Sequence, residues 1–147
     1  MTLKIAVQMD PIEAIDIAGD STFALMLEAQ ARGHDLREYH ADTLALRDGR
    51  LSATGADVKV HDEEGRHFEK SETRTVQLED YDAVLMRQDP PVDMNYITYT
   101  LMLEAVHPKT LVVKDPAEVR NAPEKLYVLQ YNEFSPPTLI SRDPQRL

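Results

Sequence analysis

Three short apolar segments, each followed by an Asp-Pro dipeptide, limit the possible folds of this chain more than any other feature. The segments are KIAVQM, YDAVLM and TLVVK, at residues 4–9, 81–86 and 110–114. Apolar runs of this length that contain β-branched residues are typical of strands buried on both faces. Proline ends a strand because it lacks the amide hydrogen that a sheet ladder needs. The pattern therefore predicts buried strands that stop near one edge of a parallel sheet.

The segment after the first strand has the pattern of a helix. Asp20 or Ser21 can cap its beginning, and Gly33 is well placed to end it. Its apolar residues share one face at helical spacing: Phe23, Ala24, Leu27 and Ala31. A second strand is expected over 35–40. A strand–helix–strand opening favours α/β architecture with a parallel sheet.

Residues 44–78 are more polar and differ from this pattern. Asp48-Gly49 is a hairpin-type dipeptide, and apolar and polar residues alternate over 58–61. We therefore predict a Rossmann-like α/β fold, an open and mostly parallel sheet flanked by helices, with an antiparallel hairpin insertion. Further along the chain, we expect three elements: a helix over 94–107, a helix over 118–131 that is interrupted near Pro123, and a short strand over 138–141.

Composition narrows the possible functions. The chain has 147 residues, with 16 Lys and Arg against 26 Asp and Glu, and its formal net charge is −10. A surface this acidic repels nucleic-acid phosphates and anionic lipids, so neither is an expected partner. Without cysteine, the chain holds no disulfide, thiolate metal site or cysteine nucleophile. No signal peptide or apolar run of about 20 residues occurs, and the expected location is the cytoplasm.

Charged residues gather where the predicted strands end. Asp10, Asp89 and Asp115 belong to the three Asp-Pro dipeptides, and Arg87 and Lys114 lie beside them. In open α/β sheets the ligand crevice lies beyond the carboxyl ends of the strands. Such a mixed edge suits a zwitterionic ligand, whose ammonium pairs with carboxylates and whose carboxylate pairs with arginine. The alternative, also open, is that each aspartate only forms a local turn.

Other motifs give little support for further chemistry. The five histidines show no paired ligand spacing, so we assign no metal site. A glycine-rich phosphate loop is absent, which argues against a complete nucleotide site. Asp143 and Pro144 have the pattern of a helix start, yet few residues follow. We expect either a frayed tail or a longer protein that continues past Leu147.

Several motifs, spread from the first strand to the last helix, resemble the bacterial-type glutathione synthetase family. They are QMDPI (8–12), DSTF (20–23), EAQARGH (28–34), LRDGR (46–50), LMRQDPPVDM (85–94), PKTLVVKDP (108–116) and VRNAPEKLYV (119–128). RQDPP and RNAPEKL are the most specific of them. Val92 departs from the pattern, because the family often has an aromatic residue there.

The resemblance implies an ATP-dependent ligase that joins γ-glutamylcysteine to glycine through an acyl phosphate, with Mg²⁺ or Mn²⁺ at the phosphates. It implies a pre-ATP-grasp α/β domain over 1–121 and the first elements of an ATP-grasp domain over 122–147. The lid, the metal ligands and most substrate arginines of the family would then lie outside this chain. We therefore expect the chain alone to be inactive, and the full protein to be a homo-oligomer.

The family pattern and the strand ends together suggest five binding residues. Arg87 would hold a substrate carboxylate, and Asp89 would support it or meet an ammonium. Asp10 would line the same crevice, and Asn95 could add a neutral hydrogen bond. Lys125 matches the first ATP-contacting lysine of the family. No catalytic residue or metal ligand is assigned to this chain.

Two other functions compete with this interpretation. One is a non-catalytic α/β module used for oligomerisation or small-molecule binding. The other is a phospho-receiver domain. Such a domain requires two adjacent acidic residues after the first strand, where this chain has Asp10-Pro11.

Overall fold

Four parallel strands form the centre of the sheet, in the order β2-β1-β7-β8. In the computed structural model, which describes residues 1–146, they are β1 (Lys4–Gln8), β2 (Asp35–Tyr39), β7 (Ala83–Met86) and β8 (Leu111–Val113). All four match strands expected from the sequence, and their parallel pairing is confirmed.

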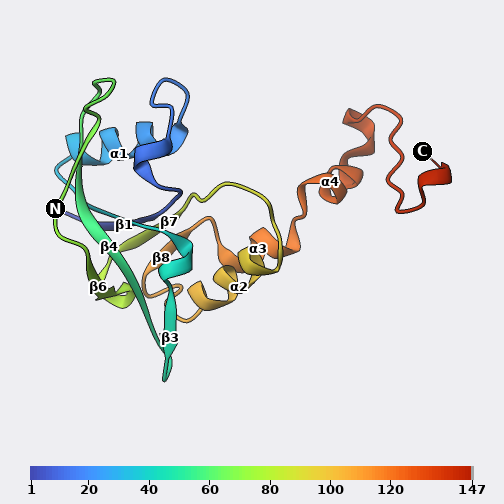
Figure 1. Cartoon of the computed structure of the whole chain (residues 1–147). Helices are drawn as coiled ribbons and strands as arrows, with labels where there is room; N and C mark the ends of the chain where they lie inside the picture. The colour runs from blue at the N-terminus through green and yellow to red at the C-terminus, as the bar shows by residue number, and fades with distance from the viewer. Residues whose placement is uncertain (147) are drawn as a thin grey trace.

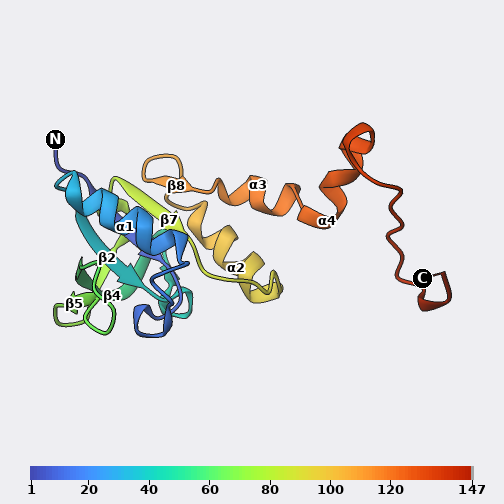
Figure 2. The ribbon, with the colours of Figure 1, turned by 90° about the horizontal axis from the view of Figure 1, so that it is seen from above.

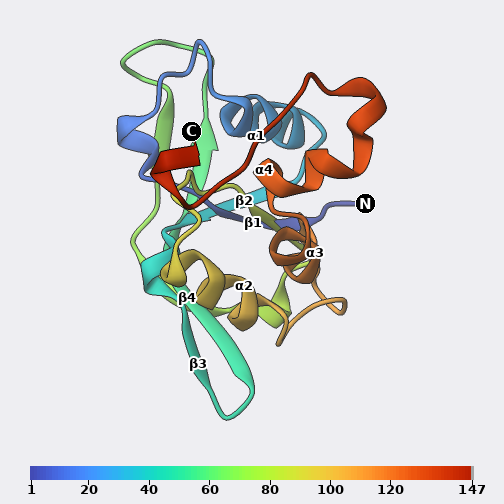
Figure 3. The same ribbon diagram turned by 90° about the vertical axis from the view of Figure 1, so that its right-hand side faces the viewer.

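Helices cover both faces of these strands. Figure 3 shows α1 (Ser21–Ala31) on one side of β1 and β2, and α2 (Met94–Leu103) with α3 (Pro116–Asn121) on the other. Side chains of β1 enter both cores in alternation. Ile5 and Val7 join the core of the α1 face, whereas Ala6 joins the core of the opposite face. This alternation explains why the strand sequence is apolar throughout.

The first helix begins and ends as its sequence predicts. The Asp20 carboxylate accepts a hydrogen bond from the Phe23 amide at 2.6 Å, which caps the helix. Gly33 follows the last turn with φ of +79°, a left-handed conformation in which glycine is favoured. These two ends fix where the chain leaves β1 and where it enters β2.

The predicted antiparallel insertion is confirmed and contributes half of the eight strands of the sheet. It contains β3 (Ala45–Arg47), β4 (Arg50–Val60), β5 (Phe68–Lys70) and β6 (Arg74–Gln77). Asp48 and Gly49 have φ values of 50° and 77°, as a type I′ hairpin turn requires. β4 pairs antiparallel with β2 and also with the other three strands of the insertion. The β3–β4 hairpin projects from the body (Figures 1 and 3).

The elements after β7 differ in part from expectation. The predicted helix over 94–107 is regular only to Leu103, with turns after it. The helix expected over 118–131 starts earlier, at Pro116, and the predicted break at Pro123 is confirmed. Beyond the break lie α4 (Glu124–Tyr127) and the 3-10 segment η4 (Val128–Phe134).

The strand predicted over 138–141 is wrong, because these residues have no regular secondary structure. They follow Pro136-Pro137 in a segment that projects from the body (Figures 1 and 2), where no strand lies alongside to pair with them. The remaining 3-10 segments are η1 (Ile12–Ala14), η2 (Ala41–Thr43), η3 (Leu78–Asp80) and η5 (Pro144–Arg146). No helix within residues 1–146 is both long and apolar enough to cross a membrane. Leu147, the end of the second predicted domain, lies outside the described residues.

Candidate functional site

The carboxyl ends of the parallel strands bring three of the predicted charged residues to one edge of the sheet. Asp10 follows β1, Arg87 follows β7 and Lys114 follows β8. β7 lies between the other two strands and is parallel to both. The topology therefore brings these charges to one edge of the sheet, whereas the crevice and the binding roles of its residues stay predictions.

Asp10 connects the ends of two neighbouring strands. Its Oδ2 accepts a hydrogen bond from the backbone amide of Asp89 at 2.8 Å. On its other side, Oδ1 lies 3.7 Å from Nε2 of His40, the residue that follows β2. The Asp10 side chain thus holds the loop after β7 in place by binding its backbone. The Asp89 carboxylate is not used in this contact and is exposed to solvent.

Arg87 is held in place by hydroxyl groups. Its Nε donates to Thr22 Oγ1 at 3.0 Å, and its Nη2 donates to Ser21 Oγ at 2.6 Å. Both acceptors belong to the first turn of α1. No carboxylate whose side chain the structure describes forms an ion pair with the guanidinium. The side chain is therefore oriented while its positive charge remains uncompensated at the edge of the sheet.

A buried chain of polar groups supports the loop that carries Arg87. The hydroxyl of Tyr39 donates to Gln8 Oε1 at 3.0 Å, and Gln8 Nε2 donates to Gln88 Oε1 at 2.8 Å. Gln8 is fully buried, and burial raises the pKa of the Tyr39 hydroxyl, which therefore remains a donor. These bonds fix the orientation of the Gln88 amide between Arg87 and Asp89.

Asp115 makes local hydrogen bonds, as the alternative interpretation of the Asp-Pro repetition expects. Its Oδ1 accepts hydrogen bonds from the amides of Ala117 and Glu118 at 2.9 and 3.0 Å, so it caps α3. The bond from the Glu118 amide is the main cause that lowers the pKa of Asp115. Asp115 therefore acts as a helix cap, and the predicted group of three crevice carboxylates is reduced to Asp10 and Asp89.

The other two predicted binding residues lie further from the strand ends. Asn95 is exposed in the first turn of α2. Lys125 belongs to α4, which projects from the side of the body that the carboxyl ends of β1 and β7 face (Figures 1 and 2). The structure thus keeps both residues on the side of the candidate site.

Sequence reasoning missed four residues that shape this edge: Ser21, Thr22, His40 and Gln88. The rule that identified Asp10 would also have found His40, because His40 is the last residue of the strand predicted over 35–40. The helix that links two parallel strands begins at the same edge, so its first residues, Ser21 and Thr22, were also predictable. We find no comparable sequence signal for Gln88.

The chain folds as an open-sheet α/β domain, a class of fold in which ligands commonly bind beyond the carboxyl ends of the strands. Residues 3–120 match the family model for the prokaryotic glutathione synthetase, N-terminal domain. The chain belongs to the prokaryotic glutathione synthetase family, as the sequence motifs indicated.

Curated relatives agree with the family match. The chain is 57% identical over 147 residues to glutathione synthetase of Rhodopseudomonas palustris, covering 100% of this chain and 47% of that protein. It is 52% identical over 147 residues to that of Brucella melitensis, with the same two coverages. For that of Vibrio vulnificus the identity is 36% over 148 residues, covering 100% and 46%. The chain therefore spans about half the length of the curated relatives it matches.

Proposed function

We propose that this chain is the N-terminal part of a glutathione synthetase, an ATP-dependent ligase that joins γ-glutamylcysteine to glycine. In that reaction the dipeptide carboxylate becomes an acyl phosphate, which the glycine amine then attacks. The observation that carries the proposal is similarity along the whole chain to relatives that bear this name. A non-catalytic module is not favoured, because these relatives are named as enzymes.

The charges at the strand ends support a substrate-binding role. The uncompensated guanidinium of Arg87 would bind a carboxylate, and the exposed carboxylate of Asp89 would bind an ammonium. γ-Glutamylcysteine carries both groups on its glutamyl end, so it fits this pair of charges. Asp10 would hold the loop in place, and Asn95 would add a neutral hydrogen bond.

Nucleotide binding would involve a different part of the chain. Lys125 would contact an ATP phosphate, in the segment 122–147 that we assign to the start of an ATP-grasp domain. Among the side chains that the structure describes, no group of three or more from His, Asp or Glu is arranged to hold a metal ion. The ligands for Mg²⁺ or Mn²⁺ would therefore come from outside the described residues. Phosphoryl transfer needs several cationic groups around the phosphate. The chain alone should therefore not catalyse the ligase reaction.

Two further properties remain predictions within this proposal. The full protein would be a homo-oligomer, which light scattering would measure. It would act in the cytoplasm.

The test is Arg87→Ala in a full-length synthetase that carries this sequence. We expect the KM for γ-glutamylcysteine to rise about tenfold or more, because a hydrogen bond to a charged group contributes about 1.5–3 kcal/mol. Arg47→Ala is the matched control, since Arg47 is exposed in the β3–β4 hairpin. Its KM should match that of the parent enzyme.

Two results would contradict the proposal at different levels. Unchanged KM and kcat in Arg87→Ala would remove Arg87 from the substrate site. A full-length parent protein that forms no glutathione from γ-glutamylcysteine, glycine and ATP would refute the assigned reaction.

A further inference from the structure

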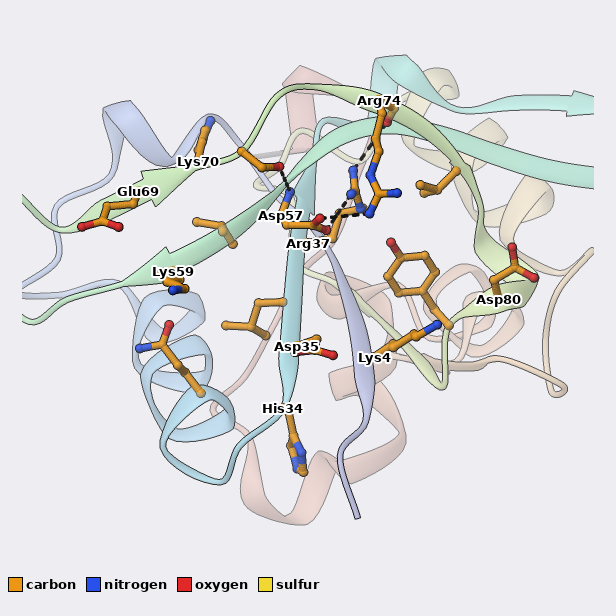
Figure 4. Close-up of a pocket in the computed structure, with 16 residues that line it drawn as sticks. Lys4, His34, Asp35, Arg37, Asp57, Lys59, Glu69, Lys70, Arg74 and Asp80 are labelled. Atoms are coloured by element: carbon orange, nitrogen blue, oxygen red, sulfur yellow. Dashed lines mark hydrogen bonds and ion pairs between the residues drawn. The ribbon is translucent and has the colours of Figure 1, made fainter.

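A cavity of about 740 Å³ lies at the opposite edge of the sheet from the candidate site. It is lined by Lys4 and Asp35, the first residues of β1 and β2, and by residues of β4, β5 and β6 (Figure 4). The parallel strands therefore separate it from Asp10 and Arg87. Its volume falls within the range of about 300–1,000 Å³ that is common for small-molecule sites.

Two arginines share one carboxylate on the wall of this cavity. Nη2 of Arg37 lies 2.5 Å from Asp57 Oδ1, and Nη2 of Arg74 lies 3.0 Å from Asp57 Oδ2. Figure 4 shows the three side chains joined by these contacts. Two positive charges against one negative charge leave a surplus of positive charge at this point. The surplus stands out because the whole chain carries a net charge of −10.

The cluster combines a buried and an exposed arginine. Arg37 is fully buried, and its Nη1 also donates to the Gly55 carbonyl at 2.6 Å. Its Nε is buried without a hydrogen-bond partner among residues 1–146. The Arg74 side chain is 63% exposed, so its remaining N–H groups are available to a ligand. A buried charge thus lies behind an exposed donor, an arrangement suited to holding an anion.

Two further donors line the same cavity. Lys4 extends from β1 on the side of the cavity where Asp80 lies (Figure 4). Tyr81 is half-buried, and burial is the main cause that raises its pKa, so its hydroxyl keeps the proton that it can donate. The carboxylates of Asp35, Glu69 and Asp80 also line the cavity and would reject large polyanions. These groups favour a small, compact anion.

We propose that this cavity binds a small anion with carboxylate or phosphate oxygens, at a site separate from the candidate substrate site. Arg74, Lys4 and Tyr81 would donate hydrogen bonds to it, and the buried Arg37 would supply charge from behind. The inference rests only on the geometry of this cavity, so it does not depend on the assigned reaction.

The test is a titration of the ¹⁵N-labelled chain, followed by amide chemical shifts. Inorganic phosphate and succinate are added separately, with sodium chloride at matched ionic strength as the reference. We expect saturable shifts at Arg37, Arg74 and Tyr81. Arg74→Gln should weaken binding about tenfold, in line with the loss of a charge-assisted hydrogen bond. Arg47→Gln, which makes the same change of charge in the β3–β4 hairpin, should bind as the parent chain does.

The outcomes are decisive in both directions. Saturation by phosphate alone or by succinate alone supports the site and identifies the chemistry of its ligand. Shifts that do not saturate, shifts centred on Arg87, or equal weakening by Arg74→Gln and Arg47→Gln would overturn it. If Arg74→Gln fails to fold, Lys4→Gln on the exposed start of β1 provides the same comparison.

Discussion

Two arginines of this chain illustrate how neighbours set the role of a charged side chain. Arg37 is fully buried against the Asp57 carboxylate, so part of its charge is compensated inside the fold. Arg87 is held by the neutral hydroxyls of Ser21 and Thr22, which orient it without compensating its charge. Uncompensated charge that is nevertheless well oriented is what carboxylate recognition needs. The difference in partners, rather than in residue type, is consistent with the proposed role of Arg87 in binding substrate.

Gly55 is a residue at which one added methyl group should disrupt the sheet. A Cβ there would lie 2.1 Å from the Glu38 carbonyl oxygen and 2.7 Å from Tyr39 Cβ, so the β2 backbone would have to move. We expect Gly55→Ala to lower the free energy of unfolding by about 1–3 kcal/mol or more, measured by urea denaturation. Gly19→Ala is the matched control, since nothing lies within 4 Å of its Cβ position. Equal stability of both variants would show that β2 and β4 are less closely packed here.

At the scale of elements, sequence patterns indicated where strands and helices occur better than which strands pair. The apolar runs located β1, β7 and β8, and Asp48-Gly49 located the β3–β4 turn. The pairing of β4 with four other strands was not predictable, because alternation of polar and apolar residues gives a period and names no partner. The strand predicted over 138–141 failed for a related reason, since a local pattern cannot supply a neighbouring strand.

The candidate site was predictable to a similar extent. The Asp-Pro repetition, with the rule for parallel sheets, placed Asp10 and Arg87 at one edge. It could not distinguish Asp115, which caps α3, from Asp10, which connects β1 to the β7 loop. That difference depends on which amide lies within reach of each carboxylate, and only the folded chain shows it.

An ion-pair cluster that connects β5 to other elements should make stability depend on pH. Lys70 Nζ lies 2.7 Å from Oε1 of Glu13 and 2.7 Å from Oε1 of Glu38. The hydrogen bond from Lys70 is the main cause that lowers the pKa of Glu13 below its ordinary value of 4.5. A carboxyl group whose pKa is lowered by folding stabilises the fold at any pH above its ordinary pKa. That contribution is lost as the pH falls through the folded-state pKa.

We therefore expect the parent chain to lose more stability on acidification than Lys70→Met does. Urea denaturation at about pH 6 and about pH 3.5 would measure the difference in each variant. Lys59→Met, an equal change of charge at an exposed position of β4, should keep the pH dependence of the parent. Identical pH dependence in the parent and Lys70→Met would show that the cluster adds no measurable stability.

Over the whole molecule, the two hydrophobic cores end where the projecting segment begins. One core lies on the α1 face and the other on the α2 face, and both are built from residues before 122. The apolar side chains of the projecting segment are largely exposed instead; Phe134, for example, is 81% exposed. Burial of apolar area is the main source of stability, so this segment should add little to the stability of the body. That contrast supports the predicted boundary between 1–121 and 122–147.

Limited proteolysis and truncation would test the boundary directly. Trypsin should cut first after Lys125 and Arg142, in the projecting segment. A chain of residues 1–121 should keep the free energy of unfolding of the full chain to within about 0.5 kcal/mol, as expected when few interactions are lost. Residues 1–115 form the matched control, because they lack α3 and the hydrogen bond from Arg120 to Thr100 at 3.0 Å. This shorter chain should be clearly less stable. If residues 1–121 were destabilised as much as residues 1–115, the segment after 121 would belong to the same folding unit and the boundary would be wrong.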